Sequence, residues 1–173
     1  TGVGRAFCGR GEMILPNGIG NLQKGKRYAN MDYILVSAIQ STKVSSITIS
    51  YNIVCQWFIH LYNRMKSWLA ALHLDPIIEV RPLIPKFHEP AHKEKDHEQF
   101  SFNFTAGVGQ MDGEVPERVW AGHNGLGNST KTQGPGSRHD MLDDHFGFWN
   151  WQKYCSMGSF TLILSKNQQL MIL

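Results

Sequence analysis

The chain has 173 residues, the size of one domain, and its 42% hydrophobic share excludes a protein that is disordered throughout. Its net charge of +3 is compatible with a nucleic-acid partner but does not indicate one by itself. Three cysteines at wide spacing exclude a disulfide framework and favour a reducing, intracellular compartment. No run reaches the roughly eighteen apolar residues of a membrane span, so no membrane partner is expected.

The first segment, residues 1–28, is rich in glycine and carries two turn signals, Pro16-Asn17-Gly18 and Lys24-Gly25-Lys26. It predicts irregular structure with one short strand at residues 3–7. Because the chain opens at Thr1 inside what reads as a strand or turn, we interpret it as a fragment. Apolar residues then recur at helical spacing and predict a helix over residues 28–40.

A strand followed directly by a helix is predicted over residues 47–72. Residues 47–51 alternate β-branched and polar side chains, which is typical of a strand. An apolar stripe at spacings of four and three then predicts a helix, and it consists of Ile53, Trp57, Leu61, Met65, Trp68 and Leu72. Asn52 therefore stands at the carboxyl end of the strand, the edge where ligands bind in open α/β sheets.

The second half of the chain is predicted to contain a short strand within residues 77–85 and a small strand or aromatic wedge at residues 100–104. Pro116 has a fixed φ and no N–H, which suits the first turn of a helix. A glycine- and serine-rich loop is expected over residues 125–138 and a helix over residues 140–154.

Three carboxylates fall within six residues where the helix at Pro116 begins, at Asp112, Glu114 and Glu117. An acidic first turn complements the helix dipole, which is the commoner reason for such residues. A hard cation such as Mg²⁺ takes oxygen ligands, so the same stretch could also deliver metal-binding carboxylates. The residue types leave both interpretations open.

Histidines and basic residues form two further groups. His88, His92 and His97 lie close in sequence, but Pro90 breaks any helix that would place the first two on one face. No second ligand cluster follows at zinc-finger spacing, so hydrogen-bonded or phosphate-facing histidines are favoured over a zinc site. A modest basic patch, interpreted as either surface charge or a phosphate contact, consists of Arg5, Arg10, Lys24, Lys26 and Arg27.

Several phrases follow one another in a specific order between residue 1 and about residue 155. They are Leu15-Pro16-Asn17-Gly18-Ile19-Gly20-Asn21-Leu22-Gln23-Lys24-Gly25, Asn30-Met31-Asp32-Tyr33, Ser50-Tyr51-Asn52-Ile53-Val54-Cys55-Gln56-Trp57, Pro85-Lys86-Phe87-His88, Asp112-Gly113-Glu114 with Glu117-Arg118-Val119-Trp120, Gly134-Pro135-Gly136-Ser137-Arg138, and Leu142-Asp143-Asp144-His145 with Trp149-Asn150. Taken together, they resemble the Kyakuja-Dileera-Zisupton (KDZ) transposases of fungi.

The resemblance implies an α/β, RNase H-like fold, with a mixed sheet flanked by helices, and DDE-type transposase chemistry. In such enzymes two metal ions, Mg²⁺ or Mn²⁺, activate a water or a DNA 3′-hydroxyl for in-line attack on a phosphodiester. Three carboxylates hold the metals, one on the first strand, one at the end of the fourth and one on a late helix. The resemblance also implies transposon-end DNA as the partner and the nucleus as the compartment.

On this resemblance, residues 1–155 form a partial RNase H-like core with the first strands missing, and residues 156–173 form a divergent tail. The catalytic positions are Asn52, Glu114 and Glu117, and the metal-ligating positions are Asp112, Glu114 and Glu117. Both glutamates remain candidates for the late-helix ligand. Glu117 is preferred because it shares a helical face with Trp120.

This sequence departs from the family pattern at two positions, and it does not contain the aspartate that the family carries on its first strand. Asn52 stands where the family has Asp in a Tyr-Asp-x-x-Cys phrase, and Gly11 interrupts a Cys-x-x-His phrase. The first-strand aspartate belongs upstream of Thr1. We therefore expect a catalytically inactive fragment of a transposase. The alternative is a non-catalytic nucleic-acid-binding or protein-interaction module derived from one.

Overall fold

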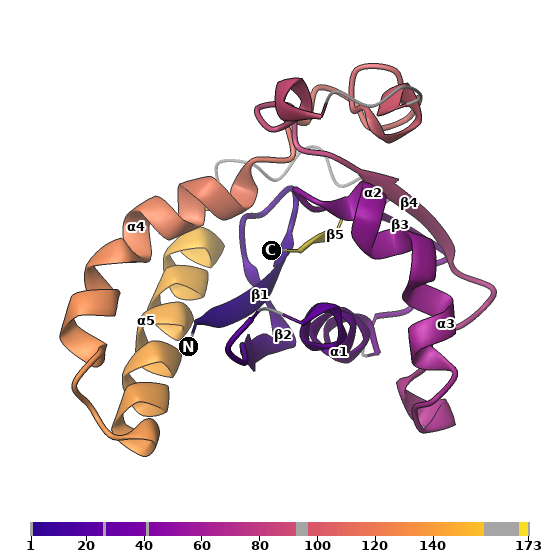
Figure 1. Cartoon of the computed structure of the whole chain (residues 1–173). Coiled ribbons are helices and arrows are strands. Elements are labelled where there is room, and N and C mark those ends of the chain that lie inside the picture. Colours follow the sequence, from indigo (N-terminus) through magenta and orange to yellow (C-terminus); the bar gives the residue numbers. More distant parts are fainter. Residues whose placement is uncertain (1, 26, 41, 93–96, 158–169, 173) are drawn as a thin grey trace.

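The computed structural model describes residues 2–25, 27–40, 42–92, 97–157 and 170–172. A five-stranded mixed sheet runs through them in the order β2-β1-β5-β3-β4 (Figure 1). Its strands are β1 (Val3–Cys8), β2 (Ile14–Asn21), β3 (Ser46–Ser50), β4 (Glu79–Leu83) and β5 (Leu170–Ile172). β1 is antiparallel to β2 and β5, whereas β3 is parallel to β5 and β4. The short β5, near the end of the chain, therefore occupies the centre of the sheet.

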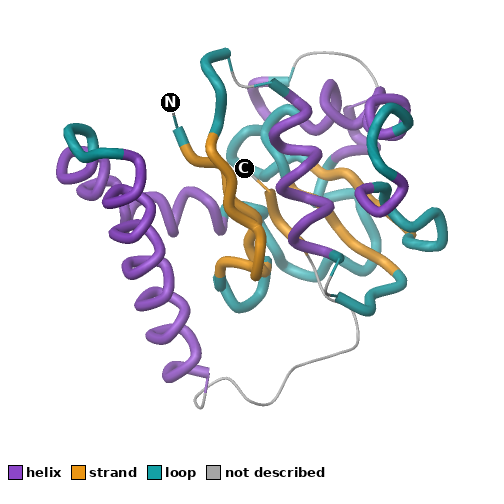
Figure 2. The backbone as a smooth tube through the Cα atoms, turned by 90° about the horizontal axis from the view of Figure 1, so that it is seen from below, coloured by secondary structure: helices purple, strands orange, loops and turns teal. Residues whose placement is uncertain are grey.

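Helices cover both faces of this sheet, as Figures 1 and 2 show from two directions. They are α1 (Tyr28–Ile39), α2 (Val54–Trp57), α3 (Leu61–Met65), α4 (Val115–Thr130) and α5 (Pro135–Ser156). Among the described residues, no helix is long and apolar enough to cross a bilayer.

Neighbouring residues of β1 contribute to two separate hydrophobic cores. Ala6 belongs to the core that α1, α2 and α3 cover, and Phe7 belongs to the core under α4 and α5. Successive side chains of a strand point to opposite faces of the sheet, so β1 supports both helical layers. The structure therefore confirms the predicted α/β class, with a mixed sheet flanked by helices.

A buried carboxylate ties α1 to the segment that follows β3. Asp32 is fully buried and accepts hydrogen bonds from Trp57 Nε1 at 2.7 Å and from Arg64 Nε at 2.6 Å. Arg64 also donates from Nη2 to Asp32 Oδ1 at 2.9 Å and to the Trp57 carbonyl at 2.8 Å. A buried charge is tolerated when it is paired and hydrogen-bonded, so these interactions explain an acidic residue inside the core.

The N-terminal segment contains more strand than its turn signals indicate. β2 forms where irregular structure is expected, because it is an edge strand of the sheet, where proline is tolerated. The pairing with β1 jumps from Arg5↔Ile19 to Phe7↔Ile14, so Pro16 and the residues after it form an irregularity within the strand.

Two helical expectations are also corrected. The helix expected after Asn52 is divided into α2, a 3₁₀ turn at Phe58–His60, α3 and a second 3₁₀ turn at Ala70–Leu72. Trp57, Leu61 and Met65 are nevertheless buried, so the apolar stripe is right although the helix is interrupted. α4 and α5 together occupy most of the loop expected at residues 125–138, because glycine in a helix costs only about 1 kcal/mol and packing can outweigh it.

Candidate active site

The parallel strands β3 and β4 end at the same edge of the sheet, and Asn52 lies at this edge. The last residues of the two strands, Ser50 and Leu83, are paired in the sheet. Asn52 follows β3 in the turn before α2, and His88 follows β4. Asn52 Nδ2 donates to His88 Nε2 at 3.2 Å, so a side-chain contact joins the two strand ends.

The acidic stretch reaches this edge through a glycine turn. Gly113 has a φ of +80°, in the left-handed region that favours glycine. A Cβ at this position would lie 2.5 Å from Ser50 Oγ and 3.0 Å from Pro85 Cα. Ser50 Oγ donates to the Gly113 carbonyl at 3.3 Å, and the Lys86 N–H donates to the Asp112 carbonyl at 2.8 Å. The start of α4 is thereby held against the ends of β3 and β4.

Two glutamates and a histidine form a compact group of candidate metal ligands there. Glu114 occupies the N-cap position of α4, and Glu117 lies in its first turn. His88 Nδ1 is 3.7 Å from Glu114 Oε2, and His88 Nε2 is 3.7 Å from Glu117 Oε1. One ligand atom from each residue lies within 4.8 Å of the other two. The fold therefore brings Asn52, Glu114 and Glu117 together, with His88 between them.

The electrostatics of this group favour uptake of a cation. Burial raises the pKa of Glu114, the charge of Glu117 acts in the same direction, and the Phe87 N–H that donates to Glu114 Oε1 at 2.8 Å opposes the rise. Within the described part of the chain, three buried atoms of this group have no hydrogen-bond partner: Asn52 Oδ1, His88 Nδ1 and Glu117 Oε2. A bound cation stabilises paired carboxylates and the unpaired oxygens of Asn52 and Glu117, whereas Nδ1 of His88 carries the proton while Nε2 accepts from Asn52.

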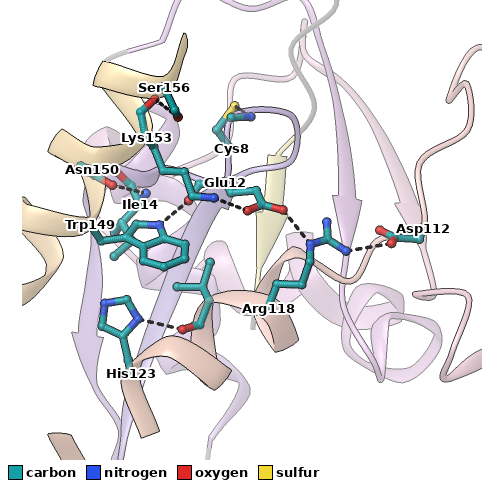
Figure 3. A network of polar contacts seen from close by, with 12 residues as sticks. Cys8, Glu12, Ile14, Asp112, Arg118, His123, Trp149, Asn150, Lys153 and Ser156 are labelled. Atoms are coloured by element: carbon teal, nitrogen blue, oxygen red, sulfur yellow. Dashed lines mark hydrogen bonds and ion pairs between the residues drawn. The ribbon is translucent and has the colours of Figure 1, made fainter. Parts of the chain in front are cut away.

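The Asp112 carboxylate is not among the clustered ligands and takes part in a different network (Figure 3). Its Oδ1 accepts from the Glu114 N–H at 2.9 Å, and its Oδ2 accepts from Arg118 Nη1 at 2.8 Å. Burial opposes ionisation of Asp112, but these hydrogen bonds and the Arg118 charge outweigh it and lower the pKa of the carboxyl group. Arg118 and Lys153 also pair with Glu12, each at 2.6 Å. The network joins the β1–β2 turn to α4 and α5.

His88 is the member of the group that the sequence did not identify. The signal that could have indicated it is its position directly after a predicted strand, since the ends of parallel strands share one edge of a sheet. Nothing in the local sequence relates it to Glu114, which is twenty-six residues further along the chain.

The basic patch expected near the start of the chain does not include Arg5. The Arg5 side chain is 2% exposed, and its guanidinium lies 4.0 Å from the ring centre of Trp120 and 3.6 Å from that of Phe146. Burial lowers the pKa of Arg5 to about 9, which leaves it protonated at neutral pH. Lys26 falls outside the described residues.

The ligand set limits the ion that the group could hold. Two carboxylates suit a hard cation such as Mg²⁺, and the imidazole of His88 adds a nitrogen ligand that suits Mn²⁺ better. Asn52 could add only a neutral amide oxygen. A divalent ion held in this way can polarise a phosphoryl oxygen and activate a water molecule.

The structure defines a mixed α/β protein with candidate metal ligands at the ends of two parallel strands, and a comparison of the chain with protein families identifies a transposase family. The family model of the Kyakuja-Dileera-Zisupton transposase matches residues 1–150. The chain therefore belongs to the KDZ transposase family and is a transposase-derived protein. No curated protein and no solved structure matches the chain.

Proposed function

We propose that the chain is an RNase H-like core of a DDE-type transposase and that it does not cleave DNA as it stands. The observation that carries the proposal is the identity of Asn52. Its amide lies at a strand end beside His88, Glu114 and Glu117, where the resemblance calls for a carboxylate.

The small negative charge of the site supports the proposed lack of DNA cleavage. Two-metal catalysis needs enough negative charge to hold two divalent ions about 4 Å apart while the phosphodiester is attacked. Glu114 and Glu117 supply at most two negative charges, and Asn52 supplies none. Mg²⁺ or Mn²⁺ is the cofactor that an intact member of the family would use, and this chain would hold it weakly.

A nicking assay on supercoiled DNA with Mg²⁺ or Mn²⁺ tests the proposal. We expect no metal-dependent nicking by the protein above the level of a Glu117→Ala variant. A control, Glu79→Ala, removes a carboxylate at the start of β4, at the opposite end of that strand. If the protein nicks DNA and Glu117→Ala abolishes the nicking, the assignment of the site stands but the proposed inactivity is wrong. Nicking that persists in Glu117→Ala would disprove the site.

DNA binding without cleavage is a second candidate function, and a basic cavity favours it. A cavity of about 800 Å³ lies between the start of β1 and the turn that joins α4 to α5, and its lining includes Lys131, Arg138 and His139. No aspartate or glutamate is among the described residues that line it. Clustered cations of this kind suit contacts to phosphates.

The salt dependence of DNA affinity tests this second function. Lys131→Glu and Arg138→Glu should each weaken binding and make the slope of log affinity against log salt shallower, by about one for each phosphate that the variant no longer neutralises. Lys43→Glu, an exposed change near the start of β3, should leave the slope unchanged if binding uses the cavity. Equal slopes for all three variants would refute DNA binding in this cavity.

We also propose the nucleus as the compartment, which imaging of a tagged chain tests.

A further inference from the structure

A second cluster of potential metal ligands lies near the carboxylate group and contains no carboxylate. It consists of Cys55 in α2, His92 at the end of the 3₁₀ turn Glu89–Ala91, and His97 at the start of the 3₁₀ turn His97–Phe100. One ligand atom from each residue lies within 4.8 Å of the other two. Cys55 is buried, and the two histidines are half-buried. Two distant segments of the chain therefore present a thiol and two imidazoles to one point.

The spacing of these atoms fits coordination to a small cation. Zinc binds thiolate sulfur at about 2.3 Å and imidazole nitrogen at about 2.0–2.1 Å, and a tetrahedral angle between two such bonds places sulfur and nitrogen about 3.5 Å apart. Cys55 Sγ lies 3.5 Å from His92 Nδ1. The rings of His92 and His97 are 5.3 Å apart, centre to centre, at an angle of 40°, which allows both to face the sulfur.

We propose that Cys55, His92 and His97 form a binding site for Zn²⁺, distinct from the group of His88, Glu114 and Glu117. Thiolate and imidazole are ligands for borderline and soft metals, whereas Mg²⁺ and Ca²⁺ prefer oxygen. Three protein ligands leave one coordination position to water. Binding displaces the thiol proton of Cys55 to solvent, as metal–thiolate bonds require.

The metal would hold together the two segments that supply the candidate active site. Asn52 is three residues before Cys55, and His88 is four residues before His92. Short 3₁₀ turns have poor hydrogen-bond geometry and gain little order from their own backbone. A metal bridge between Cys55 and His92 would therefore restrain the Asn52–His88 contact from both sides.

Titration of the full, metal-free chain with Co²⁺ tests the proposal directly. Tetrahedral cobalt bound to a thiolate absorbs in the near ultraviolet by sulfur-to-metal charge transfer, and Zn²⁺ removes the band as it displaces cobalt. We expect this band to saturate at one equivalent, to be absent in Cys55→Ser, and to be retained in Cys155→Ser, which changes an exposed thiol of α5. Retention of the band in Cys55→Ser would show that the cobalt is bound by a thiol other than Cys55. Absence of the band from the unaltered chain would show that Cys55 and His92 form a hydrogen bond and not a metal site. Either result would overturn the proposal.

Two further variants keep the test decisive if Cys55→Ser does not fold. His97→Gln changes a half-buried ligand, and we expect it to weaken Co²⁺ binding by roughly tenfold or more while the charge-transfer band remains. An unchanged affinity in this variant would overturn the three-ligand site. Glu117→Ala should retain the band at full strength, so the outcome is independent of the proposed function. Disappearance of the band in Glu117→Ala would show that thiolate coordination depends on Glu117, so the two groups would not be distinct sites.

Discussion

The substitution Asn52→Asp restores a carboxylate at the end of β3 and gives the sharpest test of the site. Asn52 contacts His88 at 3.2 Å, and His88 lies 3.7 Å from each of the two glutamates. A charge at this position therefore faces the same point as the charges of Glu114 and Glu117. We expect the variant to bind Mn²⁺ more tightly than the unaltered chain does.

The size of the effect follows from two opposing contributions. Opposite unit charges 4 Å apart attract by about 4 kcal/mol at an effective dielectric constant of about 20, and the attraction is larger for a divalent ion. Desolvation of the new carboxylate and its repulsion by Glu114 and Glu117 in the metal-free protein offset most of this gain. We expect a net gain of about 1.4 kcal/mol, which is a tenfold increase in Mn²⁺ affinity.

Thermal unfolding with and without Mn²⁺ measures this gain. When Mn²⁺ is well above both dissociation constants, a tenfold difference in affinity adds about 1.4 kcal/mol of stability, or about 3–6 °C in the midpoint of a domain of this size. Asn63→Asp adds the same charge on the exposed face of α3 and should add no Mn²⁺-dependent shift. Equal shifts for Asn52→Asp and the unaltered chain would refute the reasoning, as would a shift that survives the addition of Glu117→Ala.

Three further predictions concern the interactions that hold the site and the layers in place. Gly113→Ala should lower the free energy of unfolding, measured by urea denaturation, by more than about 1 kcal/mol. The φ of +80° and the 2.5 Å approach to Ser50 Oγ both oppose a Cβ at this position. An unchanged denaturation midpoint would show that the turn is not held against β3. Asp32→Asn should cost about 2–4 kcal/mol by the same measurement, since it leaves Arg64 without its buried partner, whereas Asp75→Asn in an exposed turn should have little effect. Glu12→Gln should cost about 1 kcal/mol at neutral pH. Burial raises the pKa of Glu12, but Lys153 and Arg118 outweigh it and lower the pKa overall, so the stabilisation is present above the unfolded-state pKa and is lost as the pH falls through the folded-state pKa. The difference between Glu12→Gln and the unaltered chain should therefore disappear in acid, and a difference that is constant with pH would contradict the ion pairs.

The local pattern of the sequence determined the elements whose signals lie within one stretch of chain. The periodicity of residues 28–40 predicts α1, the alternation of residues 47–51 predicts β3, and the fixed φ of Pro116 predicts the start of α4. Each of these depends on side-chain spacing or backbone restriction over a few residues, which the sequence contains in full. The ordered phrases similarly indicated the KDZ family, which the match over residues 1–150 confirms.

Only the tertiary structure determines which residues form the two candidate metal sites, because their ligands come from segments far apart in the chain. Asn52, His88 and Glu114 meet where two parallel strands end beside one helix start, and that meeting depends on strand order. Cys55 is separated from His92 by thirty-six intervening residues, so no ligand spacing of the finger type reveals the pair. Asp112, one residue from the glycine turn, is directed to Arg118 by the conformation of that turn. Residue spacing indicates which groups could bind a metal, and only the packing of sheet and helices determines which of them face the same point.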